Sequence, residues 1–215
     1  MKIVLFGATG HVGQRIVREA LSRGHEVVGV VRDPARARSP DPRVALVRGD
    51  ATDAASVAGA VRGADAVVSS VSPRPGTTGE APSLVDVARG VIGGLRQAGV
   101  KRLVVVGGAG SLEVAPGVAL MDTPGFPEAY RAEAEEGRRS LEVYRTEAEG
   151  LDWTFLSPAA VIQPGERTGK YRTTGDQLLT DEAGNSTISY EDYSVALLDE
   201  LERPAHVGRR FGVAY

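Results

Sequence analysis

Three glycines near the start of the chain have a spacing that suits a bound phosphate. Gly7, Gly10 and Gly13 lie between an apolar run, Ile3 to Phe6, and an amphipathic stretch, His11 to Arg23. At a turn from strand to helix, the first glycine permits the tight turn, the second lets backbone approach a pyrophosphate, and the third lets the helix pack on the strand. Unpaired N–H groups of the first helical turn then face the phosphates. The spacing predicts a dinucleotide-binding loop, and the alternative is a tight turn without a ligand.

Arginines follow the second apolar run and bear on which dinucleotide binds. Arg32 is the first residue after Val27 to Val31, and Arg36 and Arg38 stand close behind it. An acidic residue at this place would accept both ribose hydroxyls of NAD, whereas a guanidinium pairs with the 2′-phosphate of NADP. We therefore expect NADP(H) to be preferred over NAD(H). The alternative is that these arginines form an ordinary solvated surface.

Asp50 follows the third apolar run and is a candidate for contact with adenine. A carboxylate at the end of this strand can accept a hydrogen bond from the adenine amino group. The alternative role is to cap the next helix, which Thr52 or Asp53 could equally fill.

The Tyr-x-x-x-Lys pair that supplies the catalytic acid in the large short-chain reductase group is absent. None of the six tyrosines has a lysine four positions later, and the lysines are Lys2, Lys101 and Lys170. The first two stand at the starts of predicted strands, at the edge of the sheet opposite the glycine loop. We therefore expect no machinery for alcohol–ketone acid/base catalysis.

Metal and thiol chemistry are not expected either. The chain has no cysteine, which excludes disulfides and thiolate ligands. His11, His25 and His206 are too dispersed to suggest a metal site or a Ser-His-Asp triad. His11 could touch a phosphate, but we favour a solvent-facing role for it.

Strands and helices alternate along the chain, which predicts a doubly wound α/β Rossmann fold with a mostly parallel sheet in a single domain, 1–215. A Ser189 N-cap starts a helix that runs to about Glu202. Two segments, 108–126 and 158–185, lack this rhythm and follow strands, so we expect both at the carboxyl edge of the sheet as substrate-side loops. The expected strands are 3–6, 27–31, 44–47, 66–68, 103–106, 153–156 and 210–214, and the expected helices are 11–23, 54–61, 83–98, 127–149 and 189–202.

The composition limits the partners. A net charge of -3 and a pI near 5.7 argue against nucleic acid and polybasic membrane binding. The apolar run at the N-terminus is too short for a signal peptide, and no stretch approaches the roughly 20 apolar residues of a membrane span. We expect a cytoplasmic monomer or homodimer that acts on a small-molecule acceptor.

The chain resembles the atypical short-chain dehydrogenase/reductases, above all the NADH-flavin reductase-like and biliverdin-reductase-B-like proteins, with NmrA-like regulators more distant. The resemblance covers nearly the whole chain. It rests on Gly-Ala-Thr-Gly-His-Val-Gly at 7–13, Val-Val-Arg-Asp at 30–33, Gly-Asp-Ala-Thr-Asp at 49–53, Leu-Asp-Trp-Thr-Phe-Leu-Ser-Pro-Ala at 151–159 and the segment from Ile188 to Leu201.

The resemblance implies a role for individual residues. Pyrophosphate would lie on the glycine loop, the adenosine phosphate on Arg32, adenine beside Asp50 and Ala51, and Ser111 loosely matches the reductases' active-site serine. Tyr171 and Arg172 are our candidates for contact with the acceptor, in a loop that closes over the nicotinamide. The alternative is that this loop packs as a fixed hairpin on the edge of the sheet, with its basic residues in solvent. The implied cofactor-binding residues are Gly7, Thr9, Gly10, His11, Val12, Gly13, Arg32, Asp50, Ala51, then Ser69, Ser70 and Val71 beside the inner ribose, and Gly108, Ala109, Ser157, Pro158 and Ala159 beside the nicotinamide.

These observations favour an NADPH-dependent reductase of a planar acceptor such as a flavin or quinone. A conjugated acceptor stabilises its own charge after hydride transfer, so the protein need only orient it. One alternative is a non-catalytic NADP(H)-sensing regulator. Another is a nucleotide-sugar epimerase or dehydratase, against which the missing Tyr-Lys pair counts.

Overall fold

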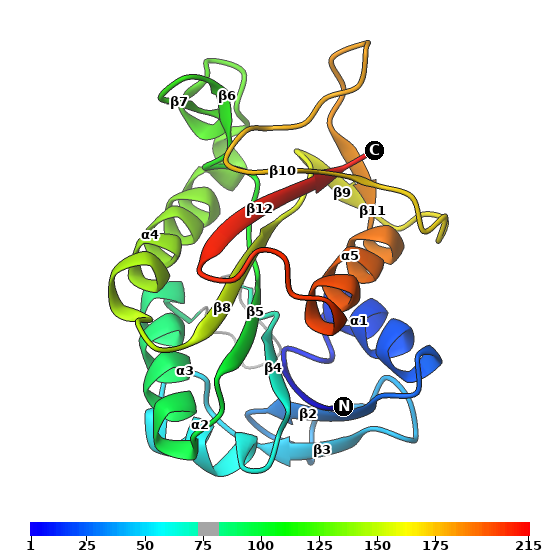
Figure 1. The fold of residues 1–215 in the computed structure, drawn as a ribbon, viewed down its shortest axis with the longest axis vertical. Coiled ribbons are helices and arrows are strands. Elements are labelled where there is room, and N and C mark those ends of the chain that lie inside the picture. Colours follow the sequence, from blue (N-terminus) through cyan, green and yellow to red (C-terminus); the bar gives the residue numbers. More distant parts are fainter. Residues whose placement is uncertain (73–81) are drawn as a thin grey trace.

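The seven predicted apolar runs form seven strands of one eight-stranded sheet in a computed structural model that describes residues 1–72 and 82–215 (Figure 1). Each run forms a strand within about two residues of its expected bounds, because unbroken β-branched and aliphatic residues suit a strand that is buried on both faces. The strands of this sheet are β1 (Lys2–Phe6), β2 (Glu26–Val31), β3 (Ala45–Arg48), β4 (Ala66–Ser69), β5 (Arg102–Val106), β8 (Asp152–Ser157), β10 (Arg172–Thr174) and β12 (Arg209–Ala214).

The strand order confirms a doubly wound α/β fold. The order is β10-β12-β8-β5-β4-β1-β2-β3, and every neighbouring pair is parallel except β10 with β12. From β1 the chain first adds β2 and β3 on one side and then β4, β5, β8 and β12 on the other. The direction reverses between β1 and β4, and open sheets of this kind bind ligands at the carboxyl ends of the strands at that point.

Helices cover both faces of the sheet (Figure 1). On one face, α1 (His11–Ser22) packs beside α5 (Tyr190–Glu202), and their apolar sides share a core with Ile3, Leu5 and Leu156. On the other face, α2 (Ala54–Val61), α3 (Leu84–Ala98) and α4 (Arg131–Glu147) enclose a second core.

The expected start of the last helix is confirmed, and the expected start of the helix over 127–149 is corrected. The Ser189 hydroxyl accepts a hydrogen bond from the Asp192 N–H at 2.9 Å, and this caps α5 as expected. The helix expected over 127–149 instead begins with a 3-10 turn, η2 (Glu128–Tyr130), before α4. Gly137 does not interrupt α4, since α4 continues through it to Glu147.

Segments 108–126 and 158–185, which lie outside the predicted alternation of strands and helices, contain short strands. Segment 108–126 holds a hairpin of β6 (Glu113–Ala115) and β7 (Val118–Ala119), followed by the 3-10 turn η1 (Leu120–Asp122). In segment 158–185, β9 (Val161–Gln163) pairs with β11 (Thr187–Ser189), and β10 joins the main sheet. These strands have two or three residues, too few for a periodic signal.

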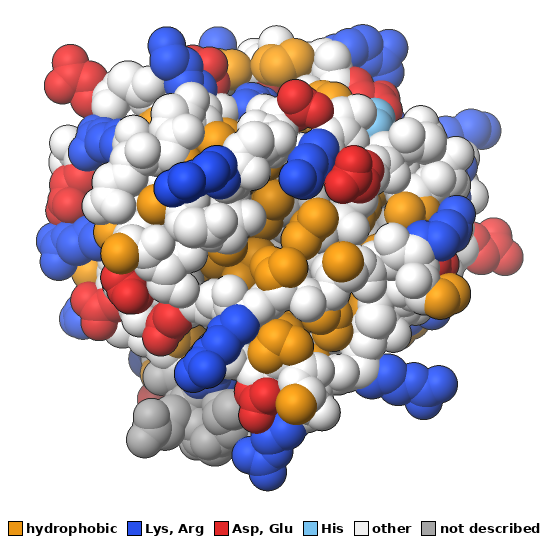
Figure 2. Space-filling model, turned by 90° about the horizontal axis from the view of Figure 1, so that it is seen from below, with side chains coloured by type: hydrophobic (Ala, Val, Ile, Leu, Met, Phe, Trp, Pro, Cys, Tyr) orange, Lys and Arg blue, Asp and Glu red, His pale blue; other side chains and the backbone are white. Residues whose placement is uncertain are grey.

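The sheet ends at β3, whose free side belongs to the face seen in Figure 2. Hydrophobic side chains gather in the middle of that face, and charged side chains surround them. Leu46 and Val47 of β3 are half-buried, because β3 has a strand neighbour on one side only. Across residues 1–72 and 82–215, none of the helices is both long enough and apolar enough to cross a membrane.

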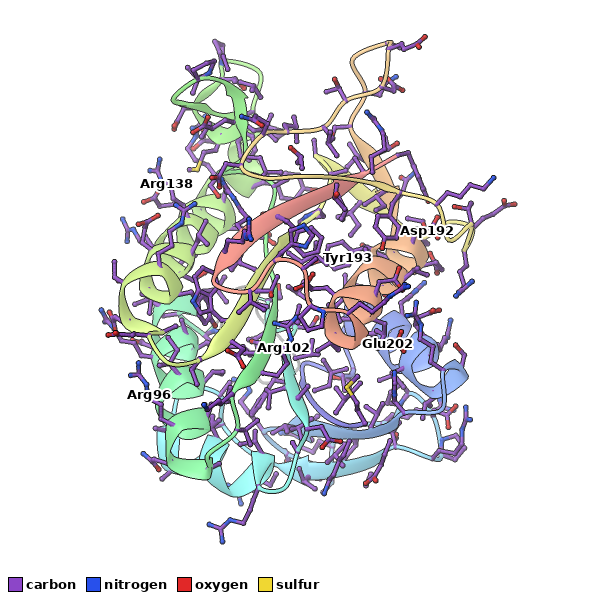
Figure 3. All side chains as sticks on the ribbon, in the orientation of Figure 1. Arg96, Arg102, Arg138, Asp192, Tyr193 and Glu202 are labelled. Atoms are coloured by element: carbon purple, nitrogen blue, oxygen red, sulfur yellow. The ribbon has the colours of Figure 1, made fainter. Side chains whose placement is uncertain are left out.

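A buried ion pair joins the middle of the sheet to α5. Arg102 of β5 lies between that strand and α5 (Figure 3), and its Nη2 donates to Glu200 Oε1 at 3.0 Å. Thr154 donates its hydroxyl to the same carboxylate, and His206 contacts the other oxygen at 2.8 Å. Burial raises the pKa of Glu200, but the bonds from His206, Ala205 and Thr154 outweigh burial and hold this pKa below its ordinary value.

Replacing Glu200→Gln should lower the free energy of unfolding by about 3 to 5 kcal/mol at pH 7, because Arg102 would remain buried without its counter-charge. Since the folded-state pKa of Glu200 is lowered, its stabilisation is present above the unfolded value of about 4.3 and is lost as the pH falls through the folded value. Urea unfolding should therefore show a difference in the free energy of unfolding between wild type and variant that is smaller near pH 3 than at pH 7.

Glu142→Gln is the matched control, because the pair of Glu142 with Arg145 is exposed. The control should change the free energy of unfolding by about 0.5 kcal/mol or less. A loss of stability in Glu200→Gln that is equal at both pH values would contradict the claim that the charge of Glu200 stabilises the fold.

Candidate functional site

The glycine loop is shaped by two backbone contacts that exclude any side chain. Gly7 has a φ of +82°, and a Cβ on it would lie 2.2 Å from the Ser70 carbonyl oxygen. A Cβ on Gly13 would lie 2.1 Å from the Gly7 carbonyl oxygen. Gly7 and Gly13 therefore allow α1 to pack closely against β1 and the end of β4.

Gly10 differs from these two glycines, because the space above it is open. A Cβ on Gly10 would have only the Gly7 carbonyl oxygen within 4 Å, at 3.3 Å. The N–H groups of His11, Val12 and Gly13 have no hydrogen-bond acceptor within the described residues, and the first turn of α1 carries no acidic residue. An open loop with free N–H groups at a helix N-terminus can bind an anion, and the residues present thus fit a dinucleotide pyrophosphate.

The end of β4 lies against this loop. The Ser70 N–H donates to the Phe6 carbonyl at 2.9 Å, so Ser69, Ser70 and Val71 lie beside Gly7, and their expected contact with the inner ribose stays a prediction. The Ser69 side chain is buried, whereas Ser70 and Val71 are half-buried. These two residues can therefore contact a molecule bound on the loop.

Arg32 lies at the carboxyl end of β2. It is exposed, and it forms no hydrogen bond or ion pair with any described residue. Arg36 and Arg38 are also exposed and can add positive potential. A guanidinium without an internal partner, at the end of the strand beside β1, can pair with a phosphate on the adenosine ribose.

Asp50 follows β3, and one of its two carboxylate oxygens accepts hydrogen bonds. Its Oδ1 accepts hydrogen bonds from the Thr52 N–H at 2.9 Å and from the Thr52 hydroxyl at 2.7 Å. These two bonds hold the pKa of Asp50 below its usual value, and the positive charge of Arg32 adds to the effect. The cap of α2 is Asp53, which accepts from the Ala55 N–H at 3.0 Å. Asp50 therefore retains a carboxylate oxygen that can accept from adenine, beside a half-buried Ala51.

The residues expected near the nicotinamide follow β5 and β8 at the same edge. Gly108 is exposed and Ala109 is half-buried, whereas Ser157, Pro158 and Ala159 are buried. The Ser157 hydroxyl is buried without a partner among the described residues. These three side chains lie beneath the surface of the edge, so they form the floor of a site rather than its open wall.

Ser111 forms hydrogen bonds with Arg210 of β12. Its hydroxyl and its carbonyl accept hydrogen bonds from Arg210 Nη1 at 2.8 and 3.0 Å. Arg210 also donates to Asp176 at 2.7 Å. Ser111 thus anchors segment 108–126 to β12 and segment 172–180, which offers no support for its expected catalytic role.

Ion pairs and hydrogen bonds tie segment 158–185 to the rest of the fold, and its closure over the nicotinamide stays a prediction. Arg167 donates two bonds of 2.7 Å to the buried Glu19 of α1. Thr168 and Gly169 donate to Asp192, whose side chain is fully buried. These contacts favour the alternative in which the segment packs in place on the edge of the sheet.

Tyr171 and Arg172, the candidates for contact with the acceptor, form hydrogen bonds away from the glycine loop, and their contact with an acceptor stays a prediction. The Tyr171 hydroxyl donates to Asp199 at 2.6 Å, and Asp199 also accepts from Arg23, which ends α1. That end is roughly 18 Å from the glycine loop, given 1.5 Å per residue along the helix. Arg172 donates to the carbonyls of Thr180 and Tyr215, each at the edge of the sheet.

The tyrosines and lysines form no catalytic pair. Lys2 and Lys101 are at the starts of β1 and β5, and Lys170 is exposed in segment 158–185. Tyr193 is fully buried and points from α5 toward β8, where its hydroxyl donates to the Leu156 carbonyl at 2.7 Å (Figure 3). The described residues also hold no cluster of His, Asp or Glu side chains suited to a metal ion.

Sequence reasoning missed one group at this edge, formed by His11 and Arg15 of α1 with Tyr190 of α5. The rings of His11 and Tyr190 are stacked, with centroids 6.5 Å apart and planes at 11°. The Arg15 guanidinium lies 5.4 Å from the centre of the Tyr190 ring. The available signal was weak: His11 and Arg15 are four residues apart on one helix face, and Tyr190 follows the Ser189 cap.

We expect Tyr171→Phe to lower the free energy of unfolding by about 1 kcal/mol, through loss of the hydrogen bond to Asp199. Because Tyr171 is remote from the glycine loop, the affinity for NADPH and the turnover of any acceptor should be unchanged. Thermal unfolding measures the expected loss of stability. Calorimetric titration and steady-state kinetics check that NADPH affinity and turnover are unchanged. A raised KM for the acceptor in Tyr171→Phe would instead indicate that Tyr171 contacts the acceptor.

Comparisons with known proteins agree with this geometry. The model of the NAD(P)H-binding family matches residues 7–204. YwnB of Bacillus subtilis is 41% identical over 217 residues, which cover 99% of this chain and 98% of YwnB.

Two solved structures span all of this chain. One, from Bacteroides thetaiotaomicron and assigned provisionally as an epimerase, is 41% identical with a TM-score of 0.87, and 96% of that chain is covered. The other, from Streptococcus pneumoniae and assigned provisionally as an NADH-flavin reductase, is 35% identical with a TM-score of 0.84, and 99% of that chain is covered. The glycine loop, the strand order and these matches together show that the chain belongs to the NAD(P)H-binding family.

Proposed function

We propose that this protein is an NADPH-dependent reductase that transfers hydride to a small planar acceptor such as a flavin or a quinone. The observation that carries the proposal is the open anion site at the glycine loop with the unpaired Arg32 beside it, in a site that lacks a Tyr-Lys acid.

Each half of the cofactor has residues suited to it. The N–H groups of His11 and Val12 would hold the pyrophosphate, and Arg32 would pair with the 2′-phosphate of NADP. Asp50 would accept from the adenine amino group. Ser70 and Val71 would line the nicotinamide ribose, above the floor formed by Ser157 and its neighbours.

The missing acid favours a planar acceptor. The bound cofactor supplies the hydride, and a conjugated ring can spread the resulting charge without a proton from the protein. What the chain must contribute is orientation of the two rings and exclusion of water from the floor of the site. An epimerase, in contrast, needs acid/base groups at the sugar, and the described residues offer no Tyr-Lys pair for that work.

The provisional assignment of the Streptococcus relative as an NADH-flavin reductase supports the same reaction class. The test is loss of the nicotinamide absorbance when purified protein is mixed with NADPH and one of FMN, FAD, riboflavin, quinones or biliverdin. We expect oxidation above the uncatalysed rate with at least one acceptor. Tight NADPH binding with no oxidation across the panel would instead favour the NADP(H)-sensing regulator.

Arg32→Asp should weaken NADPH binding by about 10- to 150-fold and leave NADH nearly unaffected or improved, because a charge-assisted pair contributes about 1.5 to 3 kcal/mol. Calorimetric titration of both cofactors with wild type and variant measures this. Equal wild-type affinities for NADPH and NADH would contradict the cofactor preference.

Arg18→Asp is the matched control for this charge reversal. Arg18 is exposed on α1 and, like Arg32, forms no hydrogen bond or ion pair with a described residue. Its reversal should change NADPH affinity by no more than about twofold, since exposed charges more than about 10 Å apart are largely screened at 0.1 M salt. An equal loss of NADPH affinity in both variants would mean that the effect of Arg32→Asp comes from the change in net charge and not from a contact with the cofactor.

A further inference from the structure

Two helices begin side by side at the edge of the sheet where the cofactor would lie. Arg15 of α1 is paired with Glu191 of α5 at 3.1 Å, and the ring of His11 faces that of Tyr190. α5 leads into β12 and contacts β5, so it lies on the β5 side of α1, away from Arg32 at the end of β2. Tyr190 therefore lies across the glycine loop from the adenosine side.

The ring of Tyr190 is held against α1 from two positions. His11 and Arg15 are one turn apart, and each approaches the ring, at 6.5 and 5.4 Å between centres. Arg15 is itself fixed, because it donates to Glu191 at 3.1 Å and to the His11 carbonyl at 3.2 Å. The ring is thus oriented before any ligand binds.

Tyr190 is also the one first-turn residue of α5 whose side-chain polar atom is free within the described part of the chain. Glu191 accepts from Arg15 and from the Gly165 N–H at 2.9 Å. Asp192 accepts from Thr168, Gly169 and the Tyr215 hydroxyl. The neighbouring carboxylates are therefore already paired, whereas the half-buried Tyr190 hydroxyl has no partner among the described residues.

We propose that Tyr190 contacts the nicotinamide half of the bound cofactor and that its hydroxyl donates a hydrogen bond to the nicotinamide ribose. The inference rests on the proposed function, which places the pyrophosphate on α1 and the adenosine on Arg32. From that pyrophosphate the nicotinamide nucleoside must leave on the opposite side, toward β4, β5 and the start of α5. Tyr190 is there a positioning residue that orients the nicotinamide toward the acceptor.

The test compares NADPH with 2′,5′-ADP, which carries the adenosine and its phosphates but no nicotinamide nucleoside. Calorimetric titration should show NADPH affinity reduced about tenfold or more in Tyr190→Ala and about 2- to 12-fold in Tyr190→Phe, the loss of one hydrogen bond. The affinity for 2′,5′-ADP should stay within about twofold of wild type in both variants.

Tyr130→Ala is the control, because Tyr130 is 53% exposed on η2 and should leave both affinities unchanged. Wild-type NADPH affinity in Tyr190→Phe would overturn the inference, and so would equal weakening of NADPH and 2′,5′-ADP in Tyr190→Ala. If Tyr190→Ala does not fold, Tyr190→Phe alone decides. Failure of wild-type protein to bind NADPH would instead contradict the proposed function itself.

Discussion

The close contact of Gly7 with both Ser70 and Gly13 is the constraint on which the site depends. Neither glycine can carry a side chain, because a Cβ would lie within about 2.2 Å of a carbonyl oxygen. This contact brings the start of α1 down onto the ends of β1 and β4, at the point where the strand order reverses. As a result the free N–H groups of α1, the end of β4 and the unpaired Arg32 all border one region, suited to an extended dinucleotide.

Beyond this loop, ion pairs and hydrogen bonds hold the connecting segments to the helices and strands. Arg167 with Glu19, Tyr171 with Asp199, and Arg210 with Asp176 each join a connecting segment to a helix or a strand. These contacts favour a site that forms without closure of segment 158–185. A chain without a Tyr-Lys acid is suited to orienting two planar rings, because a conjugated acceptor stabilises its own charge.

Much of the fold could be predicted from the sequence, because the main strands are continuous apolar runs and Ser189 caps its helix with a short local bond. β10 could not be predicted, since Arg-Thr-Thr has no apolar periodicity and is a strand only through its pairing with β12. The same limit applied to side chains. The partners of Tyr171 and Ser111 are 28 and 99 positions away in the chain, so their types alone suggested chemistry that their contacts do not support.

A crystal structure of the protein with NADPH would test the proposed cofactor site most directly. We expect the pyrophosphate within hydrogen-bond distance of the His11 and Val12 N–H groups. We also expect the 2′-phosphate beside Arg32 and the nicotinamide nucleoside toward β5 and α5. A cofactor bound elsewhere, or in the reverse direction along the loop, would contradict it.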